Sequence, residues 1–454
     1  MRYRAHLDYK PSGVQWLGDV PAHWEIRRLK TSAVYWVSNV DKVPSDDELP
    51  IRLCNYTDVY YHDHIRPDMG LMETTATAEE LRRFGLLVDD ILITKDSEEW
   101  SDIAVPALVV ETAPDLVCGY HLAIIRPDKR KLLGSFLLRA FQSCAINQQF
   151  QVAASGVTRY GLPKSAIGEA WVPVPSIEEQ RAIADFLDRE TTRIDTLVAK
   201  KRILIEKLKE KRSTLISCTV TRGLLPEAAR AAGLDPHPAL KPSGIEWLGN
   251  VPAHWEVKPI FRLATTIQTG PFGSQLHESD YVEGGIPLIN PAHIVGGRLV
   301  PEDHSAVDEK TAARLSRHQL RGGDIIMGRR GEIGRCCVVT SREQGWICGT
   351  GSLVIRLKDS DPNYFARLIS STGFSGLLEL NAVGTTMLNL SPSIVGRMRV
   401  TAPPLQEQRA ISDYLDRETK KIDQMIAKVE EAIAKLREYR TTLITAAVTG
   451  KIDV

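Results

Sequence analysis

Two stretches of this chain share the periodic pattern of apolar positions that a coiled-coil helix requires. Residues 179–200 read EQRAIADFLDRETTRIDTLVAK, and residues 407–428 read EQRAISDYLDRETKKIDQMIAK. In both, apolar side chains recur at intervals of three and four residues, which places them on one face of a helix. The pattern predicts two helices of about 35 residues, each about 50 Å long. Neither helix can bury its stripe alone, so we expect the two to pair. The predicted seam residues are Ile183, Leu187, Ile194, Leu197 and Leu208 in the first copy and Ile411, Leu415, Ile422, Met425 and Leu436 in the second.

The pattern occurs twice because the chain is internally duplicated. Fifteen of the 22 positions in the two helical stretches are identical at an offset of 228 residues. A second pair of repeats precedes them, KPSGVQWLGDVPAHWE at 10–25 and KPSGIEWLGNVPAHWE at 241–256, identical at 13 of 16 positions. The long inserts between block and helix, 26–171 and 257–399, have little evident identity. A duplicated scaffold with two unlike inserts indicates one architecture that presents two different recognition surfaces.

Within the inserts the hydrophobic pattern predicts short strands and helical regions. Apolar runs such as ILIT (91–94) and DIIMG (324–328) are typical of buried strands, whereas residues 133–151 and 362–380 have helical spacing. We therefore expect an α+β fold with two mixed globular domains and two long helices. The expected order is a first domain with its repeat block at 1–175, a long helix at 176–222, a linker at 223–240, a second domain with its block at 241–402, and a second helix with a tail at 403–454.

Composition places the chain among ordinary soluble proteins. Of its 454 residues, 43% are hydrophobic and 25% are charged, and this length suffices for two or three domains with real cores. No N-terminal apolar run reads as a signal peptide, and none approaches the roughly 20 residues that span a bilayer. We therefore expect a cytoplasmic protein without a membrane segment. Seven scattered cysteines without Cys-x-x-Cys spacing argue against a disulfide framework or a structural zinc site.

The net charge is zero, with 57 basic and 57 acidic residues, but the charges are unevenly distributed. Residues 200–212 carry seven Lys or Arg against two Glu, and residues 310–335 carry seven against one Asp and one Glu. Such runs are consistent with a basic binding surface and equally with solvated helix faces.

No catalytic constellation survives inspection of the sequence. Asp303, Asp308 and Lys310 superficially match a magnesium nuclease, but they are too closely spaced, and Asp308 reads as the cap of a helix. The chain lacks the glycine-rich turn and the Asn/Asp-Pro-Pro-aromatic loop of a methyltransferase, and it has no P-loop. His62 and His64 lack a third metal ligand nearby and fit solvated loop residues better. We therefore expect no metal site, no cofactor site and no activity of the chain alone.

The order and the sequences of several motifs resemble those of the specificity subunit of type I restriction-modification systems. The motifs are PSG-x-x-WLG-x-VPAHWE in each repeat block, GDIIMGRRGEIGR (323–335) and PPLQEQRAISDYLD (403–416), and the resemblance covers residues 1–454. It implies two target-recognition domains held apart by two antiparallel helices, with an internal pseudo-twofold, each domain reading one half of a split double-stranded DNA site. It also implies a non-catalytic subunit on which two modification subunits and the restriction subunits dock. These partners would carry S-adenosylmethionine, ATP and Mg²⁺ and perform methylation, translocation and cleavage.

Two segments of the second insert, TGPFGSQL (269–276) and GRRGEIG (328–334), are similar to glycine loops of that family. Glycines there let the backbone approach phosphates, and an arginine can fork onto a guanine or contact a phosphate. The first insert has VDDILITKDSEEWSDIAVP (88–106) in place of the second insert's Gly-Asp-x-x-x-x-Arg pattern, so its base-reading residues are hard to carry across. The candidate DNA-binding residues are Arg159, Gly270, Ser274, Arg329, Arg330 and Arg335.

The alternative from another class is a coiled-coil adaptor that joins partner proteins without binding DNA. The unlike inserts and the local basic runs weigh against it. Salt-dependent binding of duplex DNA separates the two hypotheses, because binding through phosphates weakens steeply with salt.

Overall fold

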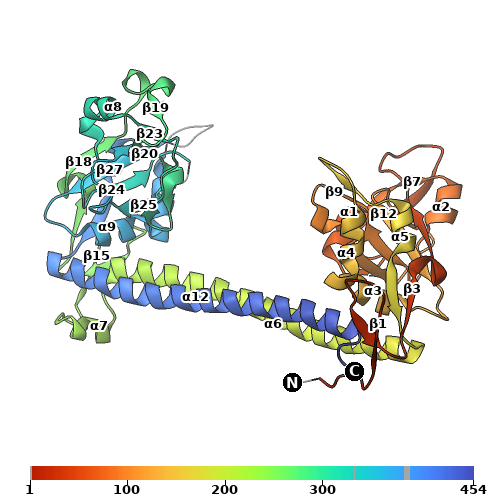
Figure 1. The fold of residues 1–454 in the computed structure, drawn as a ribbon. Coiled ribbons are helices and arrows are strands. Elements are labelled where there is room, and N and C mark those ends of the chain that lie inside the picture. Colours follow the sequence, from red (N-terminus) through yellow and green to blue (C-terminus); the bar gives the residue numbers. More distant parts are fainter. Residues whose placement is uncertain (1–2, 332, 383–388) are drawn as a thin grey trace. The chain divides into compact units, whose positions relative to one another are not determined.

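A computed structural model describes residues 3–331, 333–382 and 389–454 of the chain. It divides into two compact units, each containing one insert, one repeat block and one end of each long helix (Figure 1). Unit 1 comprises Met1–Arg202 and Glu430–Val454, and unit 2 comprises Ile203–Val429. The mixed α+β class that the sequence predicts is confirmed. Glu332, in one of the two predicted glycine loops, lies outside the described residues.

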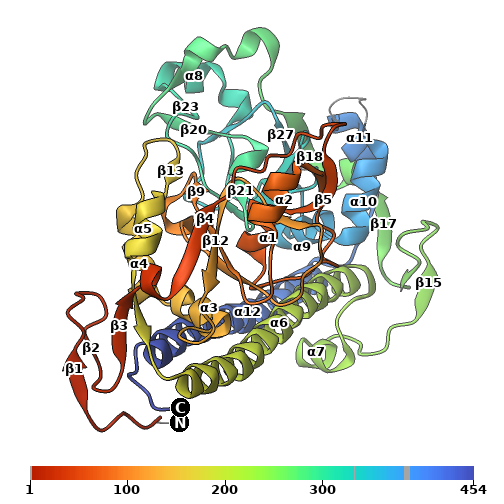
Figure 2. The same ribbon diagram turned by 90° about the vertical axis from the view of Figure 1, so that its right-hand side faces the viewer.

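In unit 1 the first insert is built on a five-stranded sheet in the order β4-β12-β8-β10-β6 (Figure 2). Every residue of β8 (Ile91–Thr94) is buried, and β8 pairs antiparallel with both β12 (Leu122–Pro127) and β10 (Pro106–Val109). A second sheet, β11-β5-β7, shares one hydrophobic core with the first. The other elements of this insert are β4 (Ala33–Val37), β5 (Leu49–Cys54), β6 (His64–Ile65), β7 (Met72–Ala76), β11 (Leu116–Cys118), α1 (Tyr56–Tyr61), α2 (Ala78–Phe84), α3 (Gly134–Gln142), α4 (Cys144–Ala153) and α5 (Lys164–Glu169).

Unit 2 repeats this topology although its insert shares little sequence with the first. Its main sheet has the order β18-β27-β24-β25, beside a sheet in the order β19-β23-β20-β26. The buried strand β24 (Ile325–Gly328) lies between β27 (Ser352–Leu357) and β25 (Cys336–Val338), as β8 lies between β12 and β10. The two inserts are therefore variants of one fold. The other elements are β18 (Ala264–Thr269), β19 (Tyr281–Val282), β20 (Ile286–Ile289), β23 (Ala306–Val307), β26 (Ile347–Cys348), α8 (Glu309–Arg314), α9 (Pro362–Ile369), α10 (Thr372–Asn381) and α11 (Pro392–Arg397).

A buried Asp–Arg pair stands at the same place in both inserts. Arg126 donates two hydrogen bonds of 2.7 Å to Asp90, and Arg356 donates two of 2.7 Å to Asp324. Each aspartate is 1% exposed and accepts a further 2.8 Å bond from the backbone N–H three residues before it. Two-point binding of a buried carboxylate is strong and directional. The inserts have thus diverged around a common internal support.

The two long helices exceed their predicted length. Helix α6 (Ile177–Arg222) has 46 residues and α12 (Leu405–Val448) has 44, so the prediction of about 35 residues is too short. Polar residues such as Glu190 and Lys201 interrupt the apolar stripe without interrupting the backbone hydrogen bonds of a helix. Each helix therefore continues almost to its glycine, Gly223 (φ +88°) or Gly450 (φ +69°), whose left-handed conformation terminates it.

Each repeat block packs at the start of a long helix in its own unit. In unit 1, His23 Nε2 lies 2.6 Å from Oε1 of Glu179, and the buried Trp24 donates its indole N–H to the same oxygen at 3.2 Å. In unit 2, His254 Nε2 lies 2.8 Å from Oε2 of Glu407. The repeated histidine therefore has a carboxylate partner in the first turn of a long helix in both units.

Most, but not all, of the predicted seam residues are buried, and the two helices lie side by side (Figure 1). Ile183, Leu187, Ile194, Ile411, Leu415 and Ile422 are buried, and Leu208 and Leu436 are half-buried. Leu197 and Met425 lie outside the seam, with 40% and 42% of their surfaces exposed. Val198 and Ile205, each 7% exposed, are buried on α6 instead. In a heptad repeat, seam positions alternate by four and three residues, so the positions after Ile194 are 198, 201 and 205. The buried residues Val198 and Ile205 fit this spacing, whereas the predicted seam residue Leu197 does not.

Two Arg–Asp ion pairs, one in each unit, define how the helices pair. Arg212 Nε lies 2.9 Å from Asp423 in unit 2, and Arg440 Nε lies 3.3 Å from Asp195 in unit 1. From Asp195 to Arg212 is 17 residues along α6, and from Arg440 to Asp423 is 17 residues back along α12, so both pairs follow one antiparallel register. At the repeat offset of 228, Arg212 corresponds to Arg440 and Asp195 to Asp423. The two pairs are therefore copies of one contact.

We expect the charge reversal Asp423→Arg to lower the free energy of unfolding by no more than about 1 kcal/mol, because the ion pair is half exposed and screened by water. The midpoint of thermal unfolding should therefore fall only slightly. The double variant Arg212→Asp with Asp423→Arg restores the attraction and should recover most of that loss. Lys435→Ala, which removes an exposed pair within α12 alone, is the control with little effect. If the double variant melts no higher than the single one under far-ultraviolet circular dichroism, the two side chains do not face each other.

Candidate nucleic-acid interface

The buried central strand of each insert ends at an equivalent basic residue, Lys95 after β8 and Arg329 after β24. The backbone N–H of Lys95 donates to His121 O at 3.0 Å, and that of Arg329 donates to Gly351 O at 3.0 Å. The carbonyl of Lys95 accepts from the N–H of Leu162, and the carbonyl of Arg329 accepts from the N–H of Leu390. Leu162 and Leu390 are themselves equivalent at the repeat offset of 228. The segments that follow these residues therefore occupy the same position in the two inserts.

Arg329 is held inside this edge of unit 2. Its Nε donates to Thr350 O at 3.0 Å and its Nη1 donates to Asn389 Oδ1 at 2.7 Å, and only 6% of the residue is exposed. Burial, and secondarily the adjacent Arg330, lowers the pKa of the Arg329 guanidinium from its usual high value. Because both contacts tie separate loops together, Arg329 acts mainly as a support for the surface around it.

Arg330 and Arg335 lie in the turn between β24 and β25. Arg330 is exposed, while its backbone forms an antiparallel bridge with Asn389. Arg335 is half-buried, and its carbonyl accepts the N–H of Gly328 at 2.8 Å. Of the two adjacent arginines that the sequence could not distinguish, Arg330 presents its guanidinium to solvent from a fixed backbone.

Gly270 and Ser274 follow β18. Gly270 is buried, and a Cβ at that position would lie 2.0 Å from Gly349 O, so the residue must be glycine for two loops to pack. Ser274 is exposed in the turn η4 (Gly273–Gln275), next to Phe272, which is 59% exposed. This loop therefore offers a small hydroxyl and an aromatic ring to a ligand, whereas Gly270 serves the packing behind them.

In unit 1 the corresponding edge has different side chains. Asp96, at the start of β9 (Asp96–Ser97), accepts hydrogen bonds from Lys95 and from His121 Nδ1, the latter at 2.9 Å. The exposed Arg159, just before β13 (Tyr160–Gly161), places Nη2 3.0 Å from His121 Nε2. Sequence reasoning singled out Arg159 and missed the other three residues. Aligning DILITKD (90–96) on DIIMGRR (324–330) by their shared Asp-Ile would have found Lys95 and Asp96.

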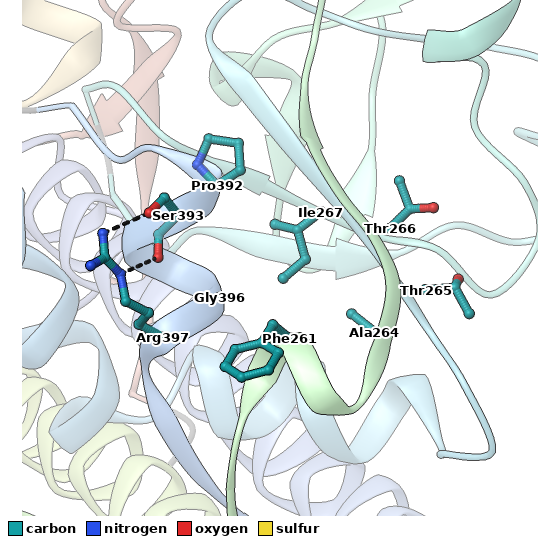
Figure 3. Close-up of a pocket in the computed structure, with 9 residues that line it drawn as sticks. All are labelled: Phe261, Ala264, Thr265, Thr266, Ile267, Pro392, Ser393, Gly396 and Arg397. Carbon is teal, nitrogen blue, oxygen red and sulfur yellow. Dashed lines mark hydrogen bonds between the residues drawn. The ribbon is translucent and has the colours of Figure 1, made fainter.

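The units also differ at an open groove of about 580 Å³ in unit 2 (Figure 3). The groove is lined by Phe261, Ala264, Thr265, Thr266, Ile267, Pro392, Ser393, Gly396 and Arg397. Figure 3 shows the guanidinium of Arg397 bonded back to Ser393, with Nη2 to Oγ at 2.6 Å. In unit 1 the ring of Tyr35, at the strand position of Ile267, lies against Gly168, the equivalent of Gly396, and fills this space.

The other chemical candidates have structural roles. Asp308 caps α8 by accepting the N–H of Thr311 at 2.7 Å, as the sequence predicts, so it does not sit on a nuclease strand. His62 Nδ1 lies 2.9 Å from the carbonyl of Asp58. Among the residues that the structure describes, no three His, Cys, Asp or Glu side chains converge on a possible metal position. Within the same residues, no helix combines the length and apolarity needed to cross a membrane.

Comparison with known proteins finds similarity to one family. A family model described as the type I restriction modification DNA specificity domain matches residues 252–434. The putative type I restriction enzyme MjaX specificity subunit of Methanocaldococcus jannaschii is 21% identical over 446 residues, 96% of each chain. The EcoKI specificity subunit of Escherichia coli is 22% identical over 376 residues, 80% of this chain and 75% of that one. The family model and these relatives are thus specificity domains or subunits of type I restriction systems, the family that the motifs of this chain resemble.

Solved structures of this specificity-subunit family share the fold. The HsdS subunit of Thermoanaerobacter tengcongensis matches with a TM-score of 0.53 and 17% identity, over 95% of this chain and 98% of that chain. A chain from a structure concerned with the complex assembly and conformational transition of the type I R-M system matches with a TM-score of 0.65 and 16% identity, over 95% and 99%. The family model covers mainly the second insert, and the shared strand order links the first insert to it.

We expect the adjacent arginines of unit 2 to differ in their effect on stability. Arg329→Ala removes a buried guanidinium together with its hydrogen bonds to the half-buried Thr350 carbonyl and Asn389 Oδ1, and should lower the free energy of unfolding by about 1–3 kcal/mol. Arg330→Ala removes an exposed side chain and should change it by less than about 0.5 kcal/mol. Urea unfolding of the two variants measures the difference. Equal losses would mean that Arg330, too, supports the fold.

Proposed function

We propose that this chain is the non-catalytic DNA-specificity subunit of a type I restriction-modification enzyme and recognises a bipartite site on double-stranded DNA. One observation carries the proposal: the two inserts have the same strand order and the same buried Asp–Arg support, yet carry different side chains at equivalent edges. Asp96 and His121 in unit 1 stand where Arg330 and Gly351 stand in unit 2. To recognise two different half-sites, two domains of the same fold must present different side chains to the DNA.

The proposed recognition domains are residues 1–175 and 241–402, with α6 and α12 in the segments 176–222 and 403–454 and the linker at 223–240. The second domain also carries exposed arginines, namely Arg314, Arg317, Arg321 and Arg330. Such arginines supply the phosphate contacts that position a protein on DNA, while side chains on fixed loops read the bases. Ser274 and Arg335 are further contact candidates on the same domain.

The chemistry in this proposal belongs to partner subunits. Modification subunits would carry S-adenosylmethionine and methylate adenine, and restriction subunits would use ATP and Mg²⁺ for translocation and cleavage. The specificity chain recognises the DNA sequence and provides the scaffold on which these subunits assemble.

The proposal predicts salt-dependent, sequence-selective binding of duplex DNA by the chain in complex with its modification subunits. Logarithmic affinity should fall linearly with the logarithm of salt concentration, because phosphate binding releases counterions. Exchanging residues 26–171 for the insert of a relative should change one half of the motif methylated in cells and leave the other half unchanged. Adenine methylation mapping of the host genome gives this result, and Arg330→Ala should affect only the other half. A complex that forms without binding DNA would instead favour the adaptor function.

We further propose that two modification subunits bind two equivalent faces at the starts of the long helices. Arg181, Asp185 and Arg189 are exposed and spaced by four residues, so they share one face of α6. The identical residues Arg409, Asp413 and Arg417 are exposed at the corresponding positions of α12. Burial does not explain why these six side chains match between the repeats, whereas binding the same partner twice does. Leu197 and Met425 add an exposed apolar side chain to each helix.

The docking proposal predicts a change in stoichiometry. Arg181→Glu should reduce the number of bound modification subunits from two to one, since one charged face is reversed while the other is intact. The double variant with Arg409→Glu should bind neither. Native mass spectrometry counts the subunits, and Arg202→Glu is the matched control, because the equivalent position on α12 already carries Glu430. Full assembly by the double variant would move the docking site elsewhere.

A further inference from the structure

In unit 1 an exposed arginine is attached to a short chain of hydrogen bonds that leads into the domain. Arg159 Nη2 lies 3.0 Å from Nε2 and 3.3 Å from Nδ1 of His121, and His121 Nδ1 lies 2.9 Å from Asp96 Oδ2. Lys95 bonds the same carboxylate oxygen. The side chains of Lys95, Asp96 and His121 are only 18–20% exposed, whereas Arg159 is exposed at the surface.

These bonds determine the state of the imidazole. A carboxylate only accepts, so His121 Nδ1 carries the proton and donates it to Asp96. Because Arg159 Nη2 lies close to both ring nitrogens, the guanidinium sits over the face of the uncharged imidazole. Burial, followed by the charge of Arg159, lowers the pKa of His121, although the bond to Asp96 opposes this. Burial raises the pKa of Asp96, but the bonds from His121 and Lys95 outweigh it and bring that pKa below its ordinary value. At neutral pH Arg159 therefore contacts an uncharged imidazole.

Contact with His121 restricts the Arg159 side chain but leaves most of its N–H groups free to bind a ligand. A guanidinium has five N–H groups in a planar fork, and of its nitrogens Nη2 is the one that contacts His121. The ring of Tyr120 packs against the imidazole, with ring centroids 3.7 Å apart, and limits its movement. An arginine whose fork is held in advance loses less entropy when it binds a planar, two-acceptor ligand. On DNA, the base edge that presents two acceptors to such a fork is O6 and N7 of guanine in the major groove.

We propose that Arg159, positioned by His121 and Asp96, is a specificity-determining residue of the first domain and reads a guanine in its half-site. This inference rests on the proposed function. Unit 2 has no equivalent relay, since Gly351 replaces His121 and Arg330 replaces Asp96, so the device belongs to one half of the site only. His121 and Asp96 are positioning residues in this scheme, and Arg159 touches the base.

The test uses the chain in complex with its modification subunits and duplex DNA randomised in both half-sites, with bound sequences read out by sequencing. Arg159→Ala should lower the preference for one G·C pair of the first half about tenfold or more, the range expected for a lost bidentate contact. Arg159→Lys should keep much of the affinity and lose the preference, because an ammonium cannot fork. The second half should remain unchanged in both variants. Arg130→Ala, an exposed arginine beyond the opposite end of β12, is the control and should select the wild-type sequence.

A pH series tests the relay itself. Below its pKa the His121 ring becomes a cation and repels Arg159. Since burial lowers that pKa, the guanine preference of the first half should decline only as the pH falls below about 6.5, the ordinary histidine value. Lys95, Asp96 and Arg159 are the charged groups that face the ring, and Asp96 stays ionised in this range. His121→Phe should weaken the preference and remove its pH dependence.

Unchanged selection by Arg159→Ala, or equal loss in both halves, would overturn the assignment. A pH dependence that persists in His121→Phe would remove the relay. A wild-type complex that selects no sequence at all would contradict the proposed function instead.

Discussion

The structure depends on the burial of two apolar helix stripes against each other. A helix of more than 40 residues with an apolar stripe is unstable alone in water, and each such helix in this chain packs against the other. Because the helices are copies, a single contact, Arg with Asp, occurs twice in one antiparallel register. Apolar side chains supply the stability of this pairing, and the repeated ion pairs favour one register over its neighbours, as polar seam positions do in coiled coils.

The repeat blocks extend this arrangement to the inserts. Trp24 and Trp255 are fully buried, and the histidine before each of them meets the carboxylate in the first turn of a long helix. The strand that follows each block pairs with the strand that leads into that helix, β3 (Glu25–Arg28) with β14 (Trp171–Val174) and β17 (Glu256–Pro259) with β28 (Arg399–Ala402). Each insert is therefore closed at its base by duplicated structure, and its sequence can change without loss of the attachment.

This separation explains how two different recognition edges arise from one fold. The residues that hold each sheet, Asp90 with Arg126 and Asp324 with Arg356, are equivalent and buried, where any change is costly. The residues beyond the strand ends are exposed, where substitutions cost little stability. Supports such as Arg329 in one domain and the Asp96–His121 pair in the other stand between these layers. These supports hold each edge in place. The exposed arginine at the edge comes from a different segment in each domain, Arg159 in the first and Arg330 in the second.

The sequence by itself determined the features that depend on local or repeated patterns. The duplication, the two long helices, the Asp308 cap and the buried strands at 91–94 and 324–328 all follow from periodicity, capping chemistry or identity at a fixed offset. Tertiary structure decided what depends on packing between distant segments. Neighbours on a helix differ by 100°, so only the partner surface determines that Val198 enters the seam and Leu197 does not. For the same reason sequence could not show that Arg329 is buried beside Asn389 while Arg330 is exposed, or that Arg159 meets a histidine 38 residues away. These contacts join loops that come together only when the sheet has formed.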